Sequence, residues 1–236
     1  MTTPSEVSAS HLRTLLGNPS FALLPAEVRD DVLAHGRQRR LAAGQRLFRR
    51  GDRADGLYIV LEGSLRLSGT SRDGLEAVLN FYEPGCWVGL VSLLDGLPRI
   101  HDAQAAMPSL VLQLTPADVE GLIGRHPAFS RFLLHLQSSL LRALLVGFEA
   151  FSTQTLEQRL ASRLLALAAA FGSANAGGGL AIELRLSQET LALLLGSTRQ
   201  RVSQLLKQWG QDGMIAQKYG SVVLLDQGRL EELARV

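Results

Sequence analysis

Side chains that can read the edges of DNA bases recur near the end of the chain, between Thr198 and Lys207. A guanidinium can bond a guanine edge bidentately, and a glutamine amide can do the same for adenine. At helical spacing, one side of this segment is polar and the other apolar. The polar set is Thr198, Arg199, Gln200, Arg201, Ser203, Gln204 and Lys207, and the apolar set is Val202, Leu205, Leu206 and Trp209. Arg201 and Lys207 suit phosphates better than bases. The segment predicts a DNA-reading helix, although an ordinary helical hairpin also has a polar face.

The residues on either side of this helix favour the DNA-reading interpretation. Ser187 can cap a first short helix that ends at Gly196, where glycine tolerates a left-handed backbone. With Gln188, Ser187 joins the expected DNA contacts. After the second helix, strands over 214–217 and 222–225 join around Tyr219-Gly220, with Lys218 near the tip. Two helices followed by a β-hairpin make a winged helix-turn-helix, a domain that binds double-stranded DNA.

Composition excludes several other classes of protein. The chain has 236 residues, a net charge of +2 and one cysteine, Cys86. A single cysteine excludes an internal disulfide and any four-cysteine metal site. No apolar run is long enough for a membrane span, and the polar N-terminal residues do not form a signal peptide. We therefore expect a cytoplasmic protein with no membrane partner. Because the net charge is small, the positive charge that binds DNA is expected to be confined to one region of the surface.

The remainder of the chain indicates an α+β fold with an N-terminal antiparallel β-roll. Short apolar runs alternate with glycine turns from Arg37 to Thr115, as in a small barrel or roll. A helix over 23–35 precedes the roll, a helix over 116–124 follows it, and a long helix runs from Pro127 to about Ser152. A hinge is expected over 153–158, then a helix over 159–170 and a flexible loop over 172–179. The predicted domains are a polar tail and short helix (1–20), the roll (21–126), the long helix (127–152) and the DNA-binding domain (153–236).

Apolar residues seven apart on the long helix predict a homodimer. Two adjacent seams bury the helix on two sides, one against the roll and one against a twin helix. A two-fold partner also suits a helix-turn-helix that reads a palindrome. The expected interface residues are Leu133, Leu140, Leu141, Leu144 and Phe148. An ordinary core helix in a monomer is the alternative.

In this order of elements, the chain resembles the cyclic-AMP receptor/fumarate–nitrate regulator family of bacterial transcription factors, from about Phe21 to Leu233. The segment 196–204, Gly-Ser-Thr-Arg-Gln-Arg-Val-Ser-Gln, is similar to the family's recognition helix. The resemblance implies a homodimer on palindromic promoter DNA that contacts RNA polymerase. The family commonly has Arg-Glu-x-x-x-Arg, where this chain has Arg199, Gln200 and Gln204. The preferred half-site is therefore expected to depart from the common one.

A second segment, 85–99, is similar to the family's phosphate-binding cassette. Nucleotide-binding relatives have a Gly-Glu pair there, and an Arg followed by Ser or Thr. This chain keeps Gly89 and Arg99 but has Leu90 and Ile100 at the other two positions. On the long helix, Leu144 and Leu145 stand where relatives have polar groups that meet the base. The expected pocket residues are Gly89, Leu90, Val91, Ser92, Arg99, Ile100, Leu144 and Leu145.

These replacements predict that cyclic AMP does not bind usefully, because each unpaired ligand polar group costs about 1–3 kcal/mol. Arg99 either holds an anion, pairs with Asp95 or Asp102, or is solvated. No cofactor is expected. The effector is left open between none, another ligand such as cyclic di-GMP, and an apolar molecule.

Two further functions fit the sequence less well. Cys86 and His101 lack the spacing of a haem site in gas-sensing relatives. A cupin-like enzyme needs clustered histidine and carboxylate ligands, and His101 is the only histidine between His35 and His126. A non-enzymatic regulator is favoured over a ligand-binding or cupin-like module without DNA binding.

Overall fold

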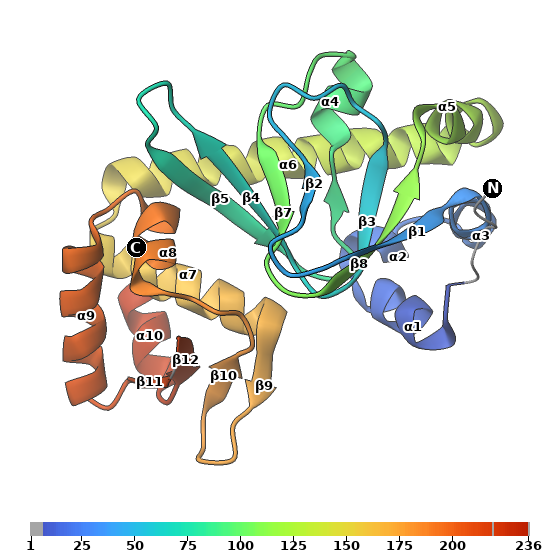
Figure 1. Cartoon of the computed structure of the whole chain (residues 1–236). Coiled ribbons are helices and arrows are strands. Elements are labelled where there is room, and N and C mark those ends of the chain that lie inside the picture. Colours follow the sequence, from blue (N-terminus) through green and yellow to red (C-terminus); the bar gives the residue numbers. More distant parts are fainter. Residues whose placement is uncertain (1–6, 219, 236) are drawn as a thin grey trace. The chain divides into compact units, whose positions relative to one another are not determined.

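A computed structural model describes the backbone of residues 7–218 and 220–235, and the side chains of these residues except Lys218. The chain divides into two compact units (Figure 1). The first contains the chain up to Gly74 together with Leu79–Ala143, and the second contains Leu75–Val78 and the chain from Leu144 onward. The boundary therefore falls within the long helix, not at its ends.

The helices and strands follow one another as an α+β protein, as the sequence predicts. In the first unit the helices are α1 (Ala9–Gly17), α2 (Pro19–Ala22), α3 (Ala26–His35), α4 (Leu90–Asp95) and α5 (Pro116–Arg125), and α6 (Pro127–Thr153) continues into the second. The helices after it are α7 (Leu156–Phe171), α8 (Gln188–Leu195), α9 (Arg199–Gln211) and α10 (Gln227–Ala234).

Two antiparallel sheets of the described chain form the roll. Their strands are β1 (Arg37–Leu41), β2 (Arg46–Phe48), β3 (Leu57–Glu62), β4 (Leu65–Thr70), β5 (Glu76–Tyr82), β6 (Trp87–Val88), β7 (Asp102–Ala105) and β8 (Ser109–Leu114). The strand orders are β1-β8-β3-β6 and β2-β7-β4-β5. Strands β1 and β2 therefore lie at sheet edges. The roll predicted from the glycine-punctuated runs is confirmed.

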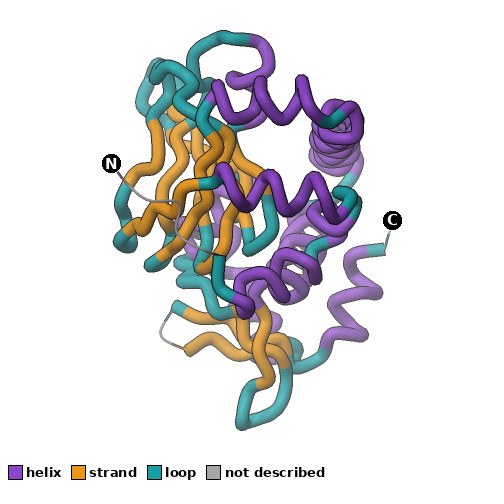
Figure 2. The backbone as a smooth tube through the Cα atoms, turned by 90° about the vertical axis from the view of Figure 1, so that its right-hand side faces the viewer, coloured by secondary structure: helices purple, strands orange, loops and turns teal. Residues whose placement is uncertain are grey.

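Strand β3 is buried on both faces from Leu57 to Leu61, which explains why this run is apolar before the exposed Glu62. Leu57, Ile59 and Leu61 face a core shared with α1, α2, α3, α5 and α6, whereas Tyr58 and Val60 face the roll interior. Successive side chains of a strand point to opposite faces, so one run serves two cores. Strands and helices of this unit are distinguished in Figure 2.

One apolar seam of helix α6 packs against the core of the same chain. Leu133 is 3% exposed and belongs to the core beneath the roll, with Phe129 and Phe132. The prediction that Leu133 lies in a dimer interface is wrong for this reason. Leu140 is half-buried, but Leu141, Leu144 and Phe148 are exposed by 57–73%.

Beyond α6 the chain differs from the sequence prediction in two places. Helix α7 begins at Leu156, because Thr155 and Gln158 form a capping box, so the predicted hinge over 153–158 shortens to two residues between helices. The predicted loop over 172–179 contains β9 (Gly172–Ala174), which pairs with β10 (Leu180–Ile182). With β11 (Ile215–Lys218) and β12 (Ser221–Leu224), these strands form a sheet ordered β11-β12-β10-β9.

Candidate nucleic-acid interface and effector pocket

Two capping side chains and one glycine turn mark the ends of α8 and α9. The Ser187 hydroxyl accepts a 2.9 Å bond from the Thr190 N–H, and the Thr198 hydroxyl accepts a 3.4 Å bond from the Arg201 N–H. Between the helices, Gly196 has φ 59°, and a Cβ there would lie 3.3 Å from the Phe151 ring. The caps and the glycine turn predicted from the sequence are confirmed. As caps, Ser187 and Thr198 position the helices as well as being available to DNA.

Helix α9 separates its polar and apolar side chains as predicted. Val202, Leu206 and Trp209 are 0–1% exposed. The predicted polar residues Arg199, Gln200, Arg201, Gln204 and Lys207 are exposed, as are Gln208 and Gln211. Ser203 and Leu205 are half-buried, so Ser203 lies at the margin of the polar face. The helix therefore presents to solvent amide and guanidinium groups, which are side chains able to bond base edges.

A contact that the sequence did not predict anchors α9 to α7. The Trp209 indole N–H donates a 3.1 Å hydrogen bond to the Glu157 carboxylate. The two residues are 52 positions apart, and no local motif links them. Because Trp209 is 1% exposed, this bond pairs the indole N–H of a buried ring.

The wing is present as an antiparallel hairpin. Ile215 pairs with Leu224 and Lys218 with Ser221. Strand β11 begins one residue later than predicted, and β12 begins one residue earlier. The Leu186 N–H donates a 2.8 Å bond to the Gly220 carbonyl, which ties the hairpin to the chain just before α8. Gln188 on α8 is half-buried. The side chain of Lys218, and Tyr219, lie outside the described residues.

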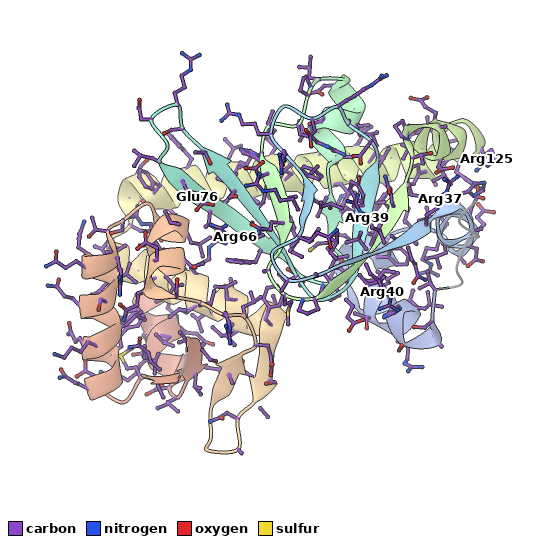
Figure 3. The ribbon with its side chains drawn as sticks, viewed as in Figure 1. Arg37, Arg39, Arg40, Arg66, Glu76 and Arg125 are labelled. Carbon is purple, nitrogen blue, oxygen red and sulfur yellow. The ribbon has the colours of Figure 1, made fainter. Side chains whose placement is uncertain are left out.

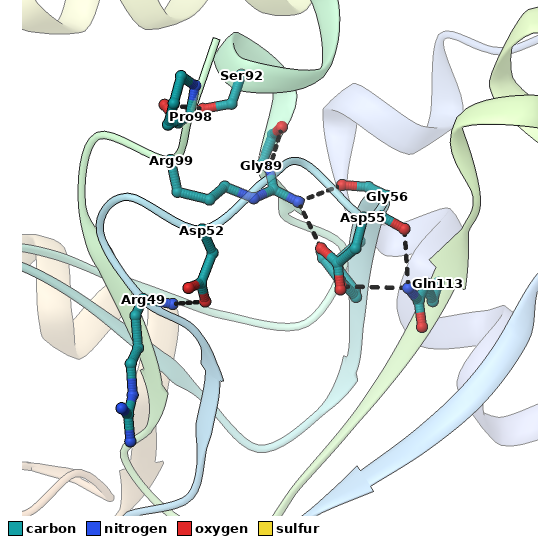
Figure 4. A network of polar contacts seen from close by, with 10 residues as sticks. Arg49, Asp52, Asp55, Gly56, Gly89, Ser92, Pro98, Arg99 and Gln113 are labelled. Atoms are coloured by element: carbon teal, nitrogen blue, oxygen red, sulfur yellow. Dashed lines mark hydrogen bonds and ion pairs between the residues drawn. The ribbon is translucent and has the colours of Figure 1, made fainter. Parts of the chain in front are cut away.

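Arg99 is buried in the roll and holds two distant segments together (Figure 4). Its Nη1 donates to the Gly89 carbonyl at 2.7 Å, and its Nη2 donates to the Gly56 carbonyl at 2.7 Å and to the Asp55 carboxylate at 3.0 Å. The guanidinium also lies 4.3 Å from the Phe48 ring centroid. Its Nε is buried without a hydrogen-bond partner among the described residues. The expected alternatives of Asp95, Asp102 or solvent are wrong, because Asp55 is the ion-pair partner.

The backbone at Gly89 brings the cassette close to this guanidinium. Gly89 has φ 95°, and a Cβ at this position would lie 2.6 Å from Arg99 Nη1. Glycine is therefore required both by its conformation and by the space available. Leu90 is buried, Val91 half-buried and Ile100 51% exposed.

The other predicted pocket residues belong to two different compact units. Ser92 is buried and donates a 3.3 Å bond to the Pro98 carbonyl. Leu144 and Leu145 lie on α6, in the other compact unit, and each is 62% exposed. Within the first unit, Gly89 of the cassette accepts a hydrogen bond from Arg99, and Ser92 lines a cleft.

Asp55, Gly56, Tyr58 and Gln113 were missed by sequence reasoning and complete the network. The Tyr58 hydroxyl donates a 2.6 Å bond to Asp55, and Gln113 Nε2 donates to the Tyr58 hydroxyl at 3.2 Å. Burial, and then the Asp55 carboxylate, raise the pKa of Tyr58, so Tyr58 remains a neutral donor. Asp55-Gly56 looked only like a turn, and nothing local marked it as a partner of Arg99.

A cleft of about 430 Å³ lies beside this network in the first unit. Its lining residues are Arg53, Ala54, Asp55, Ser92, Leu93, Gly96 and Pro116. The lining combines the apolar side chains of Ala54, Leu93 and Pro116 with the exposed Arg53 and Asp55 and the buried Ser92. This mixed lining suits an amphipathic molecule, and the Asp55 carboxylate disfavours a charged sugar phosphate.

Burial shifts the pKa values of both Cys86 and His101. Burial, and then the neighbouring Glu83, raise the pKa of the Cys86 thiol to about 12, which disfavours a thiolate ligand. Burial lowers the pKa of His101. Among the described residues no group of three His, Cys, Asp or Glu side chains is placed to hold a metal ion. None of the described helices combines the length and apolar character of a bilayer span.

Comparison with known proteins gives matches to both units. Residues 38–126 match the model of the cyclic nucleotide-binding domain, and residues 158–233 match that of the Crp-like helix-turn-helix domain. The cyclic AMP receptor protein of Thermus thermophilus is 30% identical over 92% of this chain and 97% of its own length.

Solved structures are similar over most of their length as well. A CRP/FNR-family transcriptional regulator from Thermus thermophilus has a TM-score of 0.72 and 28% identity, covering 84% of this chain and 98% of that one. The c-di-GMP responsive global regulator CLP from Xanthomonas campestris has a TM-score of 0.70 and 25% identity, covering 85% of this chain and 99% of that one.

Proposed function

Because this chain belongs to the CRP/FNR family of transcriptional regulators, we propose that it binds palindromic promoter DNA as a homodimer, with one α9 in the major groove of each half-site. The observation that carries this proposal is the division of α9 into a buried apolar face and an exposed face of Arg, Gln and Lys side chains. Each chain would read one half-site, with the two half-sites one helical turn apart.

The base preference follows from the exposed side chains. Arg199, at the helix N-terminus, would pair with a guanine, and Gln200 and Gln204 suit adenine. Arg201 and Lys207 would hold phosphates. Because Gln200 and Gln204 are amides, the preferred half-site would contain more A·T pairs than one read by an acidic and a basic residue at these positions.

The second copy would pack along the exposed seam of α6. Leu134, Leu141 and Phe148 are seven residues apart and 57–73% exposed, and Leu144 and Phe151 form a parallel row. So large an apolar surface on a single chain usually marks an interface. Two such helices side by side give an interface with two-fold symmetry.

Cyclic AMP is not expected to control this regulator. A cyclic phosphate would have to compete for Arg99 with three acceptors, each hydrogen bond to a charged group being worth about 1.5–3 kcal/mol. Leu90 offers no acceptor for a ribose hydroxyl, and Ile100 offers no donor to the phosphate. DNA binding would then need no cyclic nucleotide.

A second candidate is control by an apolar or amphipathic effector, which the cleft beside Asp55 favours. Such an effector must bind the DNA-competent conformer better than the alternative, since a ligand of equal affinity shifts no equilibrium. Cyclic di-GMP is an alternative effector, and calorimetric titration can test its binding.

The function is tested by selecting bound sequences from random duplex DNA with ligand-stripped protein. Recovery of a palindrome, bound by a dimer, would support the proposal; failure to enrich any sequence would oppose it. Calorimetric titration with cyclic AMP, cyclic GMP and cyclic di-GMP tests the effector. Micromolar binding of cyclic AMP that raises DNA affinity would overturn the proposal that DNA binding needs no cyclic nucleotide.

A further inference from the structure

One aromatic side chain at the end of α6 contacts both α7 and the turn between α8 and α9. This residue, Phe151, belongs to the last turn of α6, which ends at Thr153, and α7 begins at Leu156. All of these segments lie within the second compact unit. Only Gln154 and Thr155 connect the two helices, and each residue has two soft backbone dihedrals. The connection alone therefore does not fix the direction in which α7 leaves α6.

Arg159 fixes this corner from the side of α7. Its Nη1 donates a 3.1 Å hydrogen bond to the Phe151 carbonyl, one of the last four carbonyls of α6, which have no partner within the helix. The guanidinium carbon also lies 4.7 Å from the centroid of the Phe151 ring, a cation–π contact. A cation is favourable at the C-terminal end of a helix. Arg159 therefore joins the first turn of α7 to the last turn of α6 by two contacts with one residue.

The same aromatic ring supports the turn of the helix-turn-helix. Gly196 ends α8 with φ 59°, and a Cβ at this position would lie 3.3 Å from the Phe151 ring. The backbone of the turn thus approaches the ring closely. Phe151 is still 59% exposed, so these contacts cover only part of its surface. The end of α6, the start of α7 and the turn before α9 therefore meet at one side chain.

The direction of α9 follows from the position of this turn. Thr198 caps α9 two residues after Gly196, so little chain separates the ring contact from the helix. The exposed side chains of α9 project away from α7 and α10 (Figure 3). In a dimer joined along the exposed seam of α6, the Phe151 contacts would relate each α9 to the end of the seam.

We propose that Phe151 and Arg159 are positioning residues that set the separation of the two half-sites that the dimer accepts. The proposal rests on the proposed function, because it requires a dimer that reads a palindrome. One base pair changes the separation by about 3.4 Å and rotates one half-site by about 35° relative to the other. A corner held by these contacts resists both changes, whereas a two-residue connection without them would accommodate them.

The test measures affinity as a function of half-site separation. The palindrome selected from random DNA is prepared at its selected separation, and with its half-sites one or two base pairs closer together or farther apart. For the wild type we expect one sharp optimum, with binding at least about tenfold weaker one base pair away, as for the loss of one base contact. Arg159→Met keeps a long unbranched side chain but removes the charge and the hydrogen bond. It should reduce this discrimination to less than about threefold, and leave binding to a duplex with one intact half-site unchanged.

The matched control is Arg142→Met, which makes the same change at an exposed arginine of α6 outside the corner and should keep the sharp optimum. Phe151→Leu is a second variant, which keeps an apolar side chain at this position of the seam but removes the flat ring. It should broaden the optimum as Arg159→Met does. Because both substitutions act through one contact, the double variant should show no broader optimum than either single variant. Circular dichroism and sedimentation establish that each variant is a folded dimer.

The outcomes separate this inference from the proposed function. A sharp optimum in both Arg159→Met and Phe151→Leu would overturn this inference alone. An equal loss of affinity at every separation would do the same, because it would mean that the corner only stabilises the fold. A wild type that accepts several separations equally well would also contradict the inference. Failure of the wild type to bind any palindrome would overturn the proposed function as well.

Discussion

Arg99 and Asp55 lie 44 residues apart in the chain and form a 3.0 Å ion pair at the mouth of the cassette. The arginine side chain is 1% exposed, whereas the aspartate side chain is 48% exposed. Arg99 is therefore the buried partner, and two backbone carbonyls from different segments also accept hydrogen bonds from it. In this conformation the guanidinium joins the loop before β3 to the start of α4.

We expect Arg99→Leu to lower the free energy of unfolding by about 2–4 kcal/mol, because it leaves the Gly89 and Gly56 carbonyls unpaired. Asp55→Asn should cost less than Arg99→Leu, since the Gly89 and Gly56 carbonyls and the asparagine amide oxygen can still accept hydrogen bonds from Arg99. Urea unfolding of both variants measures the difference. Equal, small effects of the two substitutions would show that Arg99 is not a structural residue.

Substitutions on α9 should separate base reading from phosphate binding. Arg199→Ala is expected to cost about 1–3 kcal/mol of binding to the selected site and to relax preference at one base pair per half-site. The reason is that Arg199 is exposed at the helix N-terminus, where side chains meet base edges. Repeating the sequence selection with this variant measures the preference. Unchanged affinity and preference would mean that α9 does not read bases.

Lys207→Ala should act differently from Arg199→Ala. Its loss would weaken binding to all sequences about equally and reduce the salt slope by about 0.9, because one phosphate contact is lost. Gel shifts of specific and random duplexes at several salt concentrations measure both effects. A loss confined to the specific duplex would assign Lys207 to base reading instead.

The elements that local sequence features determine were predicted well. Ser187, Gly196 and Thr198 mark the ends of α8 and α9 by capping and glycine geometry, and each acts within a few residues. The division of α9 into faces follows from helical periodicity alone. The half-buried Ser203 shows the precision of that argument: periodicity gives the face but not its margin.

The contacts that the sequence did not predict are those made across long separations. Asp55 and Trp209 both find partners more than 40 residues away, and no spacing rule connects such pairs. On α6, Leu133 and Leu134 are adjacent and chemically identical, yet one is 3% exposed and the other 66%. The two seams were visible in the sequence, but which of them packs on the roll depends on the tertiary fold.

Acid should destabilise the roll unit through Asp31. Burial alone would raise the pKa of Asp31, but hydrogen bonds from His126 and Arg125 outweigh it and lower that pKa below 3.8. His35 also contacts this carboxylate, at 3.0 Å. A carboxyl whose pKa is lower in the folded state adds stability above its unfolded pKa and loses it as pH falls through the folded value.

Asp31→Asn should therefore lower stability at neutral pH and flatten the fall in stability at the acid end, below about pH 4. Urea unfolding midpoints measured from acid to neutral pH check this. Asp30→Asn, which changes the exposed neighbouring residue, is the control and should follow the wild type. Parallel pH profiles for wild type and Asp31→Asn would show that the Asp31 cluster does not contribute.

Substitutions in the exposed seam of α6 should affect dimer formation, whereas substitutions in the buried seam should affect folding. Leu141→Glu should convert the dimer to a folded monomer, because Leu141 is 57% exposed in the single chain and the charge would be buried only against a second copy. Leu133→Glu should instead unfold the roll unit, since that side chain is 3% exposed within its own core. Leu16→Glu, at a 40% exposed position on α1, provides the control and should remain dimeric.

Sedimentation at micromolar concentration gives the assembly state, and circular dichroism shows whether each variant is folded. A wild-type chain that sediments as a monomer, or a Leu141→Glu variant that remains dimeric, would rule out this seam as the interface.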